Sequence, residues 1–263
     1  MNTSGIVTPT NTWSSRMRVL ARRMRRGLVD LLFPPHCTFC GVALARSRAH
    51  ALLCSICKSG LAPKLGEVCQ RCSAPLPNHL SADKDCTHCH DRRFHFESVT
   101  TLGTYREQLR DAVLRLKVSV NEPLMWSMGR LLAERIRQTV SDFASRTLVP
   151  VPIHWTRRFS RGINQSEIIV ASISKSLRIP AAERLLICRR KTKKQGTLGA
   201  GERAKNVKGA FAISPGFDIS GCRILLIDDV MTTGATANEV AKVCKKRGAE
   251  SVKLGVIARA IGI

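Results

Sequence analysis

The sequence predicts an α/β protein whose larger, C-terminal part is a parallel sheet flanked by helices. The first observation is an apolar run without a polar face at residues 224–227, typical of a central strand covered on both sides. The second is the alternation of strand-like and helix-like segments from residue 98 onward. The third is that paired cysteines are confined to residues 36–90, which indicates a separate N-terminal region.

The N-terminal 35 residues form the first predicted region. Residues 1–12 are rich in Thr and Asn and are expected to be disordered. Apolar residues then recur at helical spacing over residues 13–32, with arginines on the other faces, and Pro34 and Pro35 follow. We expect a basic amphipathic helix that packs on the protein's own core; a membrane surface or a nucleic acid is the alternative.

Residues 36–97 form the second predicted region, which contains four CxxC pairs. Each CxxC turn directs two thiolates at one metal, and a tetrahedral zinc site needs two such turns. Gaps of 13, 11 and 13 residues between the pairs favour two consecutive structural zinc ribbons over redox-active pairs; crossed pairing is the alternative. The predicted zinc ligands are Cys37, Cys40, Cys54, Cys57, Cys69, Cys72, Cys86 and Cys89.

Residues 98–263 form the third predicted region, the α/β domain. Apolar alternation and helical spacing divide it into segments. The predicted strands are residues 99–105, 148–153, 184–190, 206–213 and 252–258, in addition to the central strand at 224–227. The predicted helices are residues 109–117, 123–141 and 164–177, with another after residue 236. The basic, glycine-rich residues 191–203 are expected to be a mobile loop that closes over a charged ligand.

Two carboxylates follow the central strand, where open α/β sheets place their ligands. The next residues offer hydroxyls, backbone N–H groups and a helix N-terminus, which together suit a phosphate. Carboxylates repel phosphate but accept hydrogen bonds from sugar hydroxyls, so the pattern predicts a ribose 5′-phosphate site, with Asp228 and Asp229 as its catalytic residues. The predicted binding residues are Asp228, Asp229, Val230, Thr232, Thr233, Gly234, Ala235 and Thr236.

Arginines cluster directly after the strand at residues 148–153. Guanidinium groups bind phosphate oxygens in pairs, so the cluster and the glycine-rich loop suit a pyrophosphate group; a basic surface loop is the alternative. The predicted pyrophosphate and loop residues are Pro152, Arg157, Arg158, Arg161, Gly162, Asn164, Gln165, Gln195 and Arg203.

The charge balance favours anionic partners. The chain has 43 Lys and Arg against 19 Asp and Glu, a net charge of +24, which suits a phosphorylated ligand, a nucleic acid or an anionic membrane surface. No apolar run approaches the length of a membrane-spanning helix, so no stable membrane insertion is expected. Arginines interrupt the N-terminal apolar residues, which argues against a secretory signal and favours a cytoplasmic protein without disulfides.

Three motifs besides the cysteines make the sequence resemble the ComF/GntX family over residues 30–260. They are D-D-V-x-T-T-G-A-T from residue 228, P-V-P followed by R-G-x-N-Q at residues 150–165, and a motif from Gln195 to Phe211. The resemblance implies a type I phosphoribosyltransferase fold with an N-terminal double zinc ribbon. It also implies phosphoribosyl pyrophosphate (PRPP) with Mg²⁺ as ligand, and a link to DNA uptake or utilisation during competence, with single-stranded DNA and DNA-processing proteins as partners.

Two functions follow from the residues and the resemblance together. The first is a phosphoribosyltransferase that moves phosphoribose from PRPP to an unknown acceptor and releases pyrophosphate. The alternative is a non-catalytic competence factor that senses PRPP and binds single-stranded DNA. Pyrophosphate release separates the two hypotheses.

Overall fold

The computed structural model describes residues 34–45, 52–76, 86–118, 121–154, 164–192 and 199–262. The chain divides into two compact units, residues 1–54 and 55–263. The N-terminal tail and basic helix expected before residue 34 lie outside the described residues. The predicted region boundaries at 35/36 and 97/98 stay predictions.

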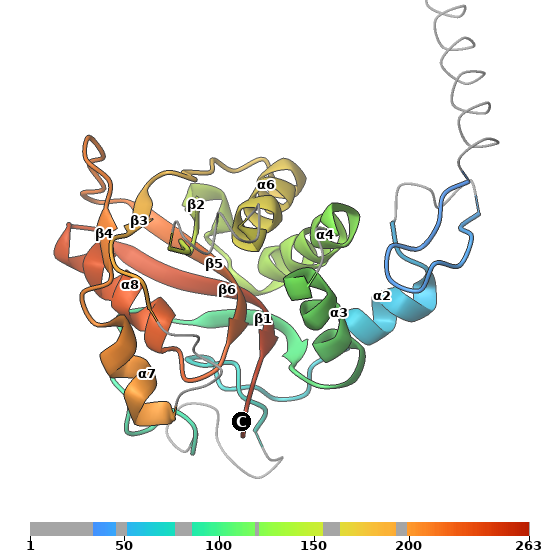
Figure 1. Cartoon of the computed structure of the whole chain (residues 1–263), viewed down its shortest axis with the longest axis horizontal. Coiled ribbons are helices and arrows are strands. Elements are labelled where there is room, and N and C mark those ends of the chain that lie inside the picture. The colour runs from blue at the N-terminus through green and yellow to red at the C-terminus, as the bar shows by residue number, and fades with distance from the viewer. Residues whose placement is uncertain are drawn as a thin grey trace, which may run out of the picture. The chain divides into compact units, whose positions relative to one another are not determined.

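A four-stranded parallel sheet forms the centre of the larger unit (Figure 1). Its order is β1 (Val99–Thr104), β6 (Ser251–Arg259), β5 (Arg223–Met231) and β2 (Thr147–Pro150). The apolar run of β5 is almost completely buried between β6 and β2. The prediction of a central parallel strand is therefore confirmed.

Helices cover both faces of this sheet (Figure 1). One face carries α3 (Glu107–Val118), α4 (Glu122–Thr139) and α6 (Gln165–Leu177), and the other carries α8 (Ala235–Lys246). The helices expected at these places are confirmed. Gly129 lets α4 approach α6 closely, because a Cβ there would lie 2.5 Å from the Cβ of Ser172. Among the described residues outside 178–222, a short helix, α2 (Ser55–Leu61), and a 3₁₀ turn, η2 (Phe143–Ser145), are the remaining elements.

Residues 178–222 differ from the prediction. Strands β3 (Leu186–Cys188) and β4 (Phe211–Ile213) pair antiparallel in a small sheet of their own, and both are shorter than expected. Helix α7 (Ala200–Val207) occupies the end of the predicted loop and the start of the predicted strand at 206–213. Good helix formers dominate α7, and the carboxylate of Glu202 accepts a hydrogen bond from the amide of Gly199 (3.0 Å) at its start. These local helix preferences outweigh the loop preference of Gly199 and Gly201 at the start of α7.

Strand β5 is longer than predicted, whereas β2 ends at Pro150 rather than at residue 153. Asp228 and Asp229 therefore lie within the strand and not in a turn after it. The neighbouring strand explains this extension: β6 runs alongside to its own end and pairs with Asp228 through Val256. A partner strand in register overrides the low strand preference of aspartate.

The cysteine segments repeat one turn, as expected of a duplicated ribbon. In each, the amide of the first cysteine donates to a carbonyl five residues later, at 2.8 Å in both cases. These pairs are Cys37 with Val42 and Cys69 with Ala74. The residue after the second cysteine has a positive φ in both turns, 77° at Gly41 and 53° at Ser73.

Candidate functional site

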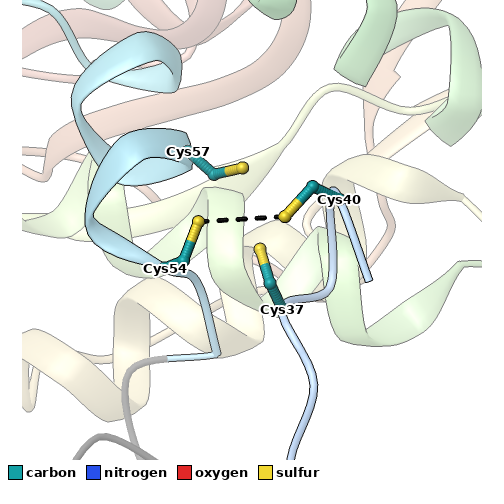
Figure 2. Close-up of side chains that lie close together, drawn as sticks. All are labelled: Cys37, Cys40, Cys54 and Cys57. Carbon is teal, nitrogen blue, oxygen red and sulfur yellow. Dashed lines mark hydrogen bonds between the residues drawn. The ribbon is translucent and has the colours of Figure 1, made fainter. Parts of the chain in front are cut away.

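The eight paired cysteines form two groups of four, and the sulfur atoms of each group lie within 4.8 Å of one another. The groups are Cys37, Cys40, Cys54 and Cys57 (Figure 2), and Cys69, Cys72, Cys86 and Cys89. Consecutive pairing is therefore confirmed, and the crossed alternative is wrong. Measured sulfur separations are 3.8 Å in the first group and 3.6 and 3.7 Å in the second. Tetrahedral zinc with bonds of about 2.3 Å separates its sulfurs by about 3.8 Å, so both groups fit structural zinc.

The two groups differ in their surroundings. In the first group, burial raises the pKa of the Cys37 thiol. Hydrogen bonds from the backbone of Cys40 and Cys54 outweigh this effect, so the pKa is lowered to about 6. All four cysteines of the second group are buried in the same apolar core as the sheet strands. Burial raises the pKa of Cys72 to about 11. A metal ion supplies the positive charge that stabilises thiolates in such a place.

We expect the purified protein to contain two zinc ions per chain. Cys54→Ser should reduce this content to one, because a cluster with three thiolates loses affinity for a structural metal. Cys222→Ser is the matched control, because Cys222 belongs to neither group and should leave two ions. Elemental analysis of the metal measures both. A content of two in Cys54→Ser would contradict the assignment of the first cluster.

The carboxylate pair lies on β5 at the edge of the sheet where the strands end. The amide of Asp229 donates to Oδ1 of Asp228 (2.9 Å), and the amide of Val230 donates to Oδ1 of Asp229 (2.7 Å). Lys117, at the end of α3, forms an ion pair with Asp229 (3.5 Å). Burial raises the pKa of Asp228 well above its usual range, and the charge of Asp229 raises it further. The pair therefore favours a proton, a cation or hydrogen-bond donors beside it.

A tight turn joins β5 to α8. Gly234 is the N-cap residue of α8, with a φ of 77°, and it offers no side-chain acceptor to the first-turn amides. Thr233 Oγ1 accepts a hydrogen bond from the amide of Ala235 (3.4 Å). Amides at a helix N-terminus and the helix dipole favour an anion. We call residues 232–236 the phosphate-binding loop, after the ligand that the sequence predicts for them.

A cavity of about 310 Å³ borders this loop at Thr232 and Thr233. Its other walls are residues 87–92 from the second zinc ribbon, Arg203 of α7, and residues 259–262, which begin with Arg259 at the end of β6. Arg203 is only 5% exposed, and it lines the same cavity as Thr232 and Thr233 of the loop. Three arginines line the cavity, Arg92 included, and their charge suits a phosphorylated ligand of moderate size.

The other predicted pyrophosphate residues divide into two sets. Asn164 caps α6 by accepting a hydrogen bond from Ser166 (3.2 Å), and Gln165 donates to the carbonyl of Leu116 (3.0 Å). Pro152 and Asn164 line a second cavity, together with residues of β3, and no residue of the phosphate-binding loop is among its lining residues. The remaining predicted residues, Arg157, Arg158, Arg161, Gly162 and Gln195, lie outside the described residues.

Sequence reasoning missed three basic residues around the site: Lys117, Arg92 and Arg259. Arg92 donates to the carbonyl of Thr233 (2.9 Å) across 141 residues of sequence. A basic residue at a helix or strand end is common on protein surfaces and carries no local signal of a distant partner.

In the part of the chain that the structure describes, no helix has the length and apolar character to cross a membrane.

Two family models match the chain. The Double zinc ribbon domain matches residues 28–90, and the Phosphoribosyl transferase domain matches residues 153–261. The second match contains the carboxylate pair, the phosphate-binding loop and Arg203. The first contains all eight cysteines.

Curated relatives align along most of the chain. Competence protein F of Haemophilus influenzae is 28% identical over 79% of this chain and 90% of its own length. DNA utilization protein YhgH of Escherichia coli K12 is 27% identical over 88% of this chain and 100% of its own. Competence protein ComFC of Streptococcus pneumoniae is 28% identical over 84% of this chain and 94% of its own.

Among solved structures, hypoxanthine phosphoribosyltransferase from Trypanosoma cruzi is 14% identical, with a TM-score of 0.34, over 51% of this chain and 64% of its own. The Double zinc ribbon domain precedes the Phosphoribosyl transferase domain, in the order that the sequence predicts. The chain joins a double zinc ribbon domain to a phosphoribosyl transferase domain, and it is similar along most of its length to Competence protein F, ComFC and DNA utilization protein YhgH, as the resemblance to the ComF/GntX family implies.

Proposed function

We propose that this protein binds PRPP with Mg²⁺ and transfers its phosphoribosyl group to a nitrogen acceptor, with release of pyrophosphate. The observation that carries the proposal is the partly buried pair Asp228–Asp229, followed at once by the Gly234 turn and a helix N-terminus. A carboxylate pair beside an anion-binding turn suits a sugar whose 5′-phosphate occupies the turn. The phosphoribosyl transferase domain model, which spans these residues, supports this assignment.

The phosphate-binding loop holds the 5′-phosphate through its backbone amides and threonine hydroxyls. Asp228 and Asp229 accept hydrogen bonds from the ribose 2′- and 3′-hydroxyls, with Val230 beside the sugar. Lys117 keeps Asp229 oriented through their ion pair. Carboxylate oxygens are also ligands that Mg²⁺ prefers, and the raised pKa of Asp228, caused by burial and by the charge of Asp229, supports a positive charge beside the pair. When bound, Mg²⁺ neutralises charge on the pyrophosphate leaving group.

Arginines contact the pyrophosphate in this proposal. Arg203 does so from the cavity at the phosphate-binding loop, together with Arg157, Arg158, Arg161 and Gln195 from the predicted loops. We assign Pro152, Gly162, Asn164 and Gln165 to the same binding segment as Arg157, Arg158 and Arg161, because they are its neighbours in the sequence. The bond from C1′ to the pyrophosphate oxygen breaks while a bond from C1′ to the acceptor nitrogen forms. The ionised carboxylates stabilise positive charge that develops at C1′.

Calorimetric titration with PRPP and MgCl₂, followed by a pyrophosphate-release assay with candidate acceptors, tests this proposal. Asp229→Asn should abolish release and weaken PRPP binding at least about tenfold, because it removes one charge-assisted hydrogen bond worth roughly 1.5–3 kcal/mol. Asp218→Asn makes the same charge change at an exposed turn and is the control. Tight PRPP binding without release for any acceptor would favour the non-catalytic sensor.

The charge and the relatives favour single-stranded DNA as a second ligand, and DNA-processing proteins as partners. The net charge is +24, and the relatives are named for competence and for DNA utilization. The chain has only 12 aromatic residues (8 Phe, 3 Trp and 1 Tyr), so we assign most of the contacts to phosphates rather than to stacked bases. The metal-binding thiols suit a reducing compartment, so we place the protein in the cytoplasm.

Affinity for a labelled oligo(dT) should therefore fall at least about tenfold between roughly 50 and 200 mM salt. Phosphate contacts release counterions, and added salt opposes that release. Fluorescence anisotropy measures the affinity at each salt concentration. Undetectable binding at low salt, or binding that salt does not change, would contradict the DNA proposal.

A further inference from the structure

Arg259 is a charged residue at the end of an apolar strand, yet it is only 4% exposed. Its Nε donates to the carbonyl of Cys72 (2.9 Å). Its Nη1 lies within hydrogen-bond distance of the carbonyls of Met231 (3.1 Å), Ala260 (2.5 Å) and Thr232. Within the described residues, no salt bridge to a carboxylate accompanies these contacts. The partners of the guanidinium there are main-chain carbonyls, together with the side chain of Cys72, which interacts with the guanidinium electrostatically.

These contacts join two parts of the molecule that are far apart in sequence. Cys72 is a ligand of the second zinc cluster, and Met231 and Thr232 lead into the phosphate-binding loop. A parallel contact reinforces the connection, since Arg92 follows the same cluster and donates to the carbonyl of Thr233 (2.9 Å). The carbonyls of residues 231–233 thus accept hydrogen bonds from two arginines, one bonded to Cys72 of the second cluster and one that follows this cluster in the sequence.

Peptide geometry gives this connection a consequence for the ligand. In a trans peptide the N–H points opposite to the C=O, and the structure has no cis peptide among its described residues. Fixing the carbonyls of residues 231–233 therefore fixes the directions of the amides of Thr232, Thr233 and Gly234. A cation at each carbonyl also polarises the peptide and strengthens its N–H as a donor to phosphate.

We propose that Arg259 is a positioning residue through which zinc in the second cluster sets the geometry of the phosphate-binding loop. The ligand side of this inference rests on the proposed PRPP binding. Zinc fixes Cys72, Cys72 fixes the guanidinium, and the guanidinium orients the loop amides. The second ribbon is then part of the substrate-binding apparatus and not only a separately folded attachment.

Arg259→Lys tests the link, because lysine keeps the charge but lacks the planar fork that reaches Cys72 and the loop together. We expect about tenfold weaker PRPP binding with two zinc ions retained. Arg146→Lys is the matched control: Arg146 is 2% exposed and donates to the carbonyl of Ile224 (3.2 Å) at the opposite end of β5. It should lower the melting temperature and leave PRPP affinity unchanged. Equal losses of affinity in both variants would overturn the proposal.

A double-mutant cycle with Cys86→Ser separates positioning from simple destabilisation. Cys86→Ser should reduce the zinc content to one and weaken PRPP binding, and adding Arg259→Lys should weaken it little further, since both changes act through one link. Additive losses would overturn the proposal.

Amide hydrogen exchange tests the link without PRPP. Arg259→Lys and Cys86→Ser should each speed exchange at residues 231–236 more than Arg146→Lys does. Unchanged exchange at these residues would overturn the link. Faster exchange in a protein that does not bind PRPP would instead support the link and refute the proposed function.

Discussion

Asparagine in place of Asp228 is expected to make the protein more stable and to remove most of its PRPP binding. Burial raises the pKa of Asp228, and the neighbouring charge of Asp229 adds to the shift, so the ionised pair is costly without a ligand. An amide has the same shape, and its oxygen still accepts the hydrogen bond from the amide of Asp229. It lacks the charge that the ribose hydroxyls and Mg²⁺ require.

The pH dependence follows from the direction of the shift. The folded state holds a proton on Asp228 that the unfolded chain releases, so wild-type stability falls as pH rises from the usual aspartate pKa, about 4, through the raised pKa. Asp228→Asn has no such proton, so its stability advantage should grow across that window and then become constant. Wild-type PRPP affinity should rise over the same window, because binding needs the carboxylate.

Thermal unfolding and calorimetric titration at several pH values measure both effects. A gain of about 1 kcal/mol corresponds to roughly 2–4 °C in melting temperature for a domain of this size. Loss of a charge-assisted hydrogen bond corresponds to roughly a 10- to 100-fold weaker affinity. Asp218→Asn should leave PRPP affinity unchanged and should not raise stability, because hydrogen bonds from Ser220 lower the pKa of Asp218 and so favour its charged form. A less stable Asp228→Asn, or one with wild-type affinity, would show that the pair is structural.

Sequence patterns predicted correctly those elements whose signal lies within a few consecutive residues. The apolar run before Asp228 has no polar face because β6 and β2 flank β5 and helices cover it, and this alone identifies a central strand. The CxxC spacing identified the zinc clusters because ligand geometry is itself local. The capped helix after Asn164 is a similar case, since its N-cap hydrogen bond spans two residues.

The parts that sequence reasoning missed depend on distant partners. Arg259 bonds to Cys72 across 187 residues, and nothing near Arg259 in the sequence marks it as buried. Asp228 was expected after the strand, because the pairing that extends β5 comes from β6. Helix α7 was hidden for the opposite reason: two glycines suggested a loop, while the residues between and after them favour a helix.

The second zinc cluster also connects fold to function in a way that the sequence did not suggest. Its four cysteines share one apolar core with Phe96, Leu226 and Val256 of the α/β domain. Residues that follow the cluster line the cavity at the phosphate-binding loop. Gly234 of that loop packs against Phe94 and Phe96, which follow the second zinc cluster in the sequence. These two rings stack on each other with centroids 4.4 Å apart.

Alanine at Gly234 is therefore expected to remove PRPP binding. The φ of 77° at this position costs a residue with a Cβ about 1 kcal/mol or more. The new Cβ would also lie 2.7 Å from Cε of Met231 and 3.4 Å from Cε1 of Phe94, so the end of the Met231 side chain must move, and relief of the strained φ would displace the loop amides. Displaced amides hold phosphate poorly, and we expect at least about a tenfold loss of affinity.

Gly221→Ala is the matched control for this change. Gly221 has a similar φ of 70°, but a Cβ there would meet no atom within 4 Å. Both variants should lose similar stability from the backbone strain, about 1 kcal/mol, as measured by thermal unfolding. Only Gly234→Ala should lose PRPP affinity. If the two variants bound PRPP equally well, the turn before α8 could not be the place where the 5′-phosphate sits.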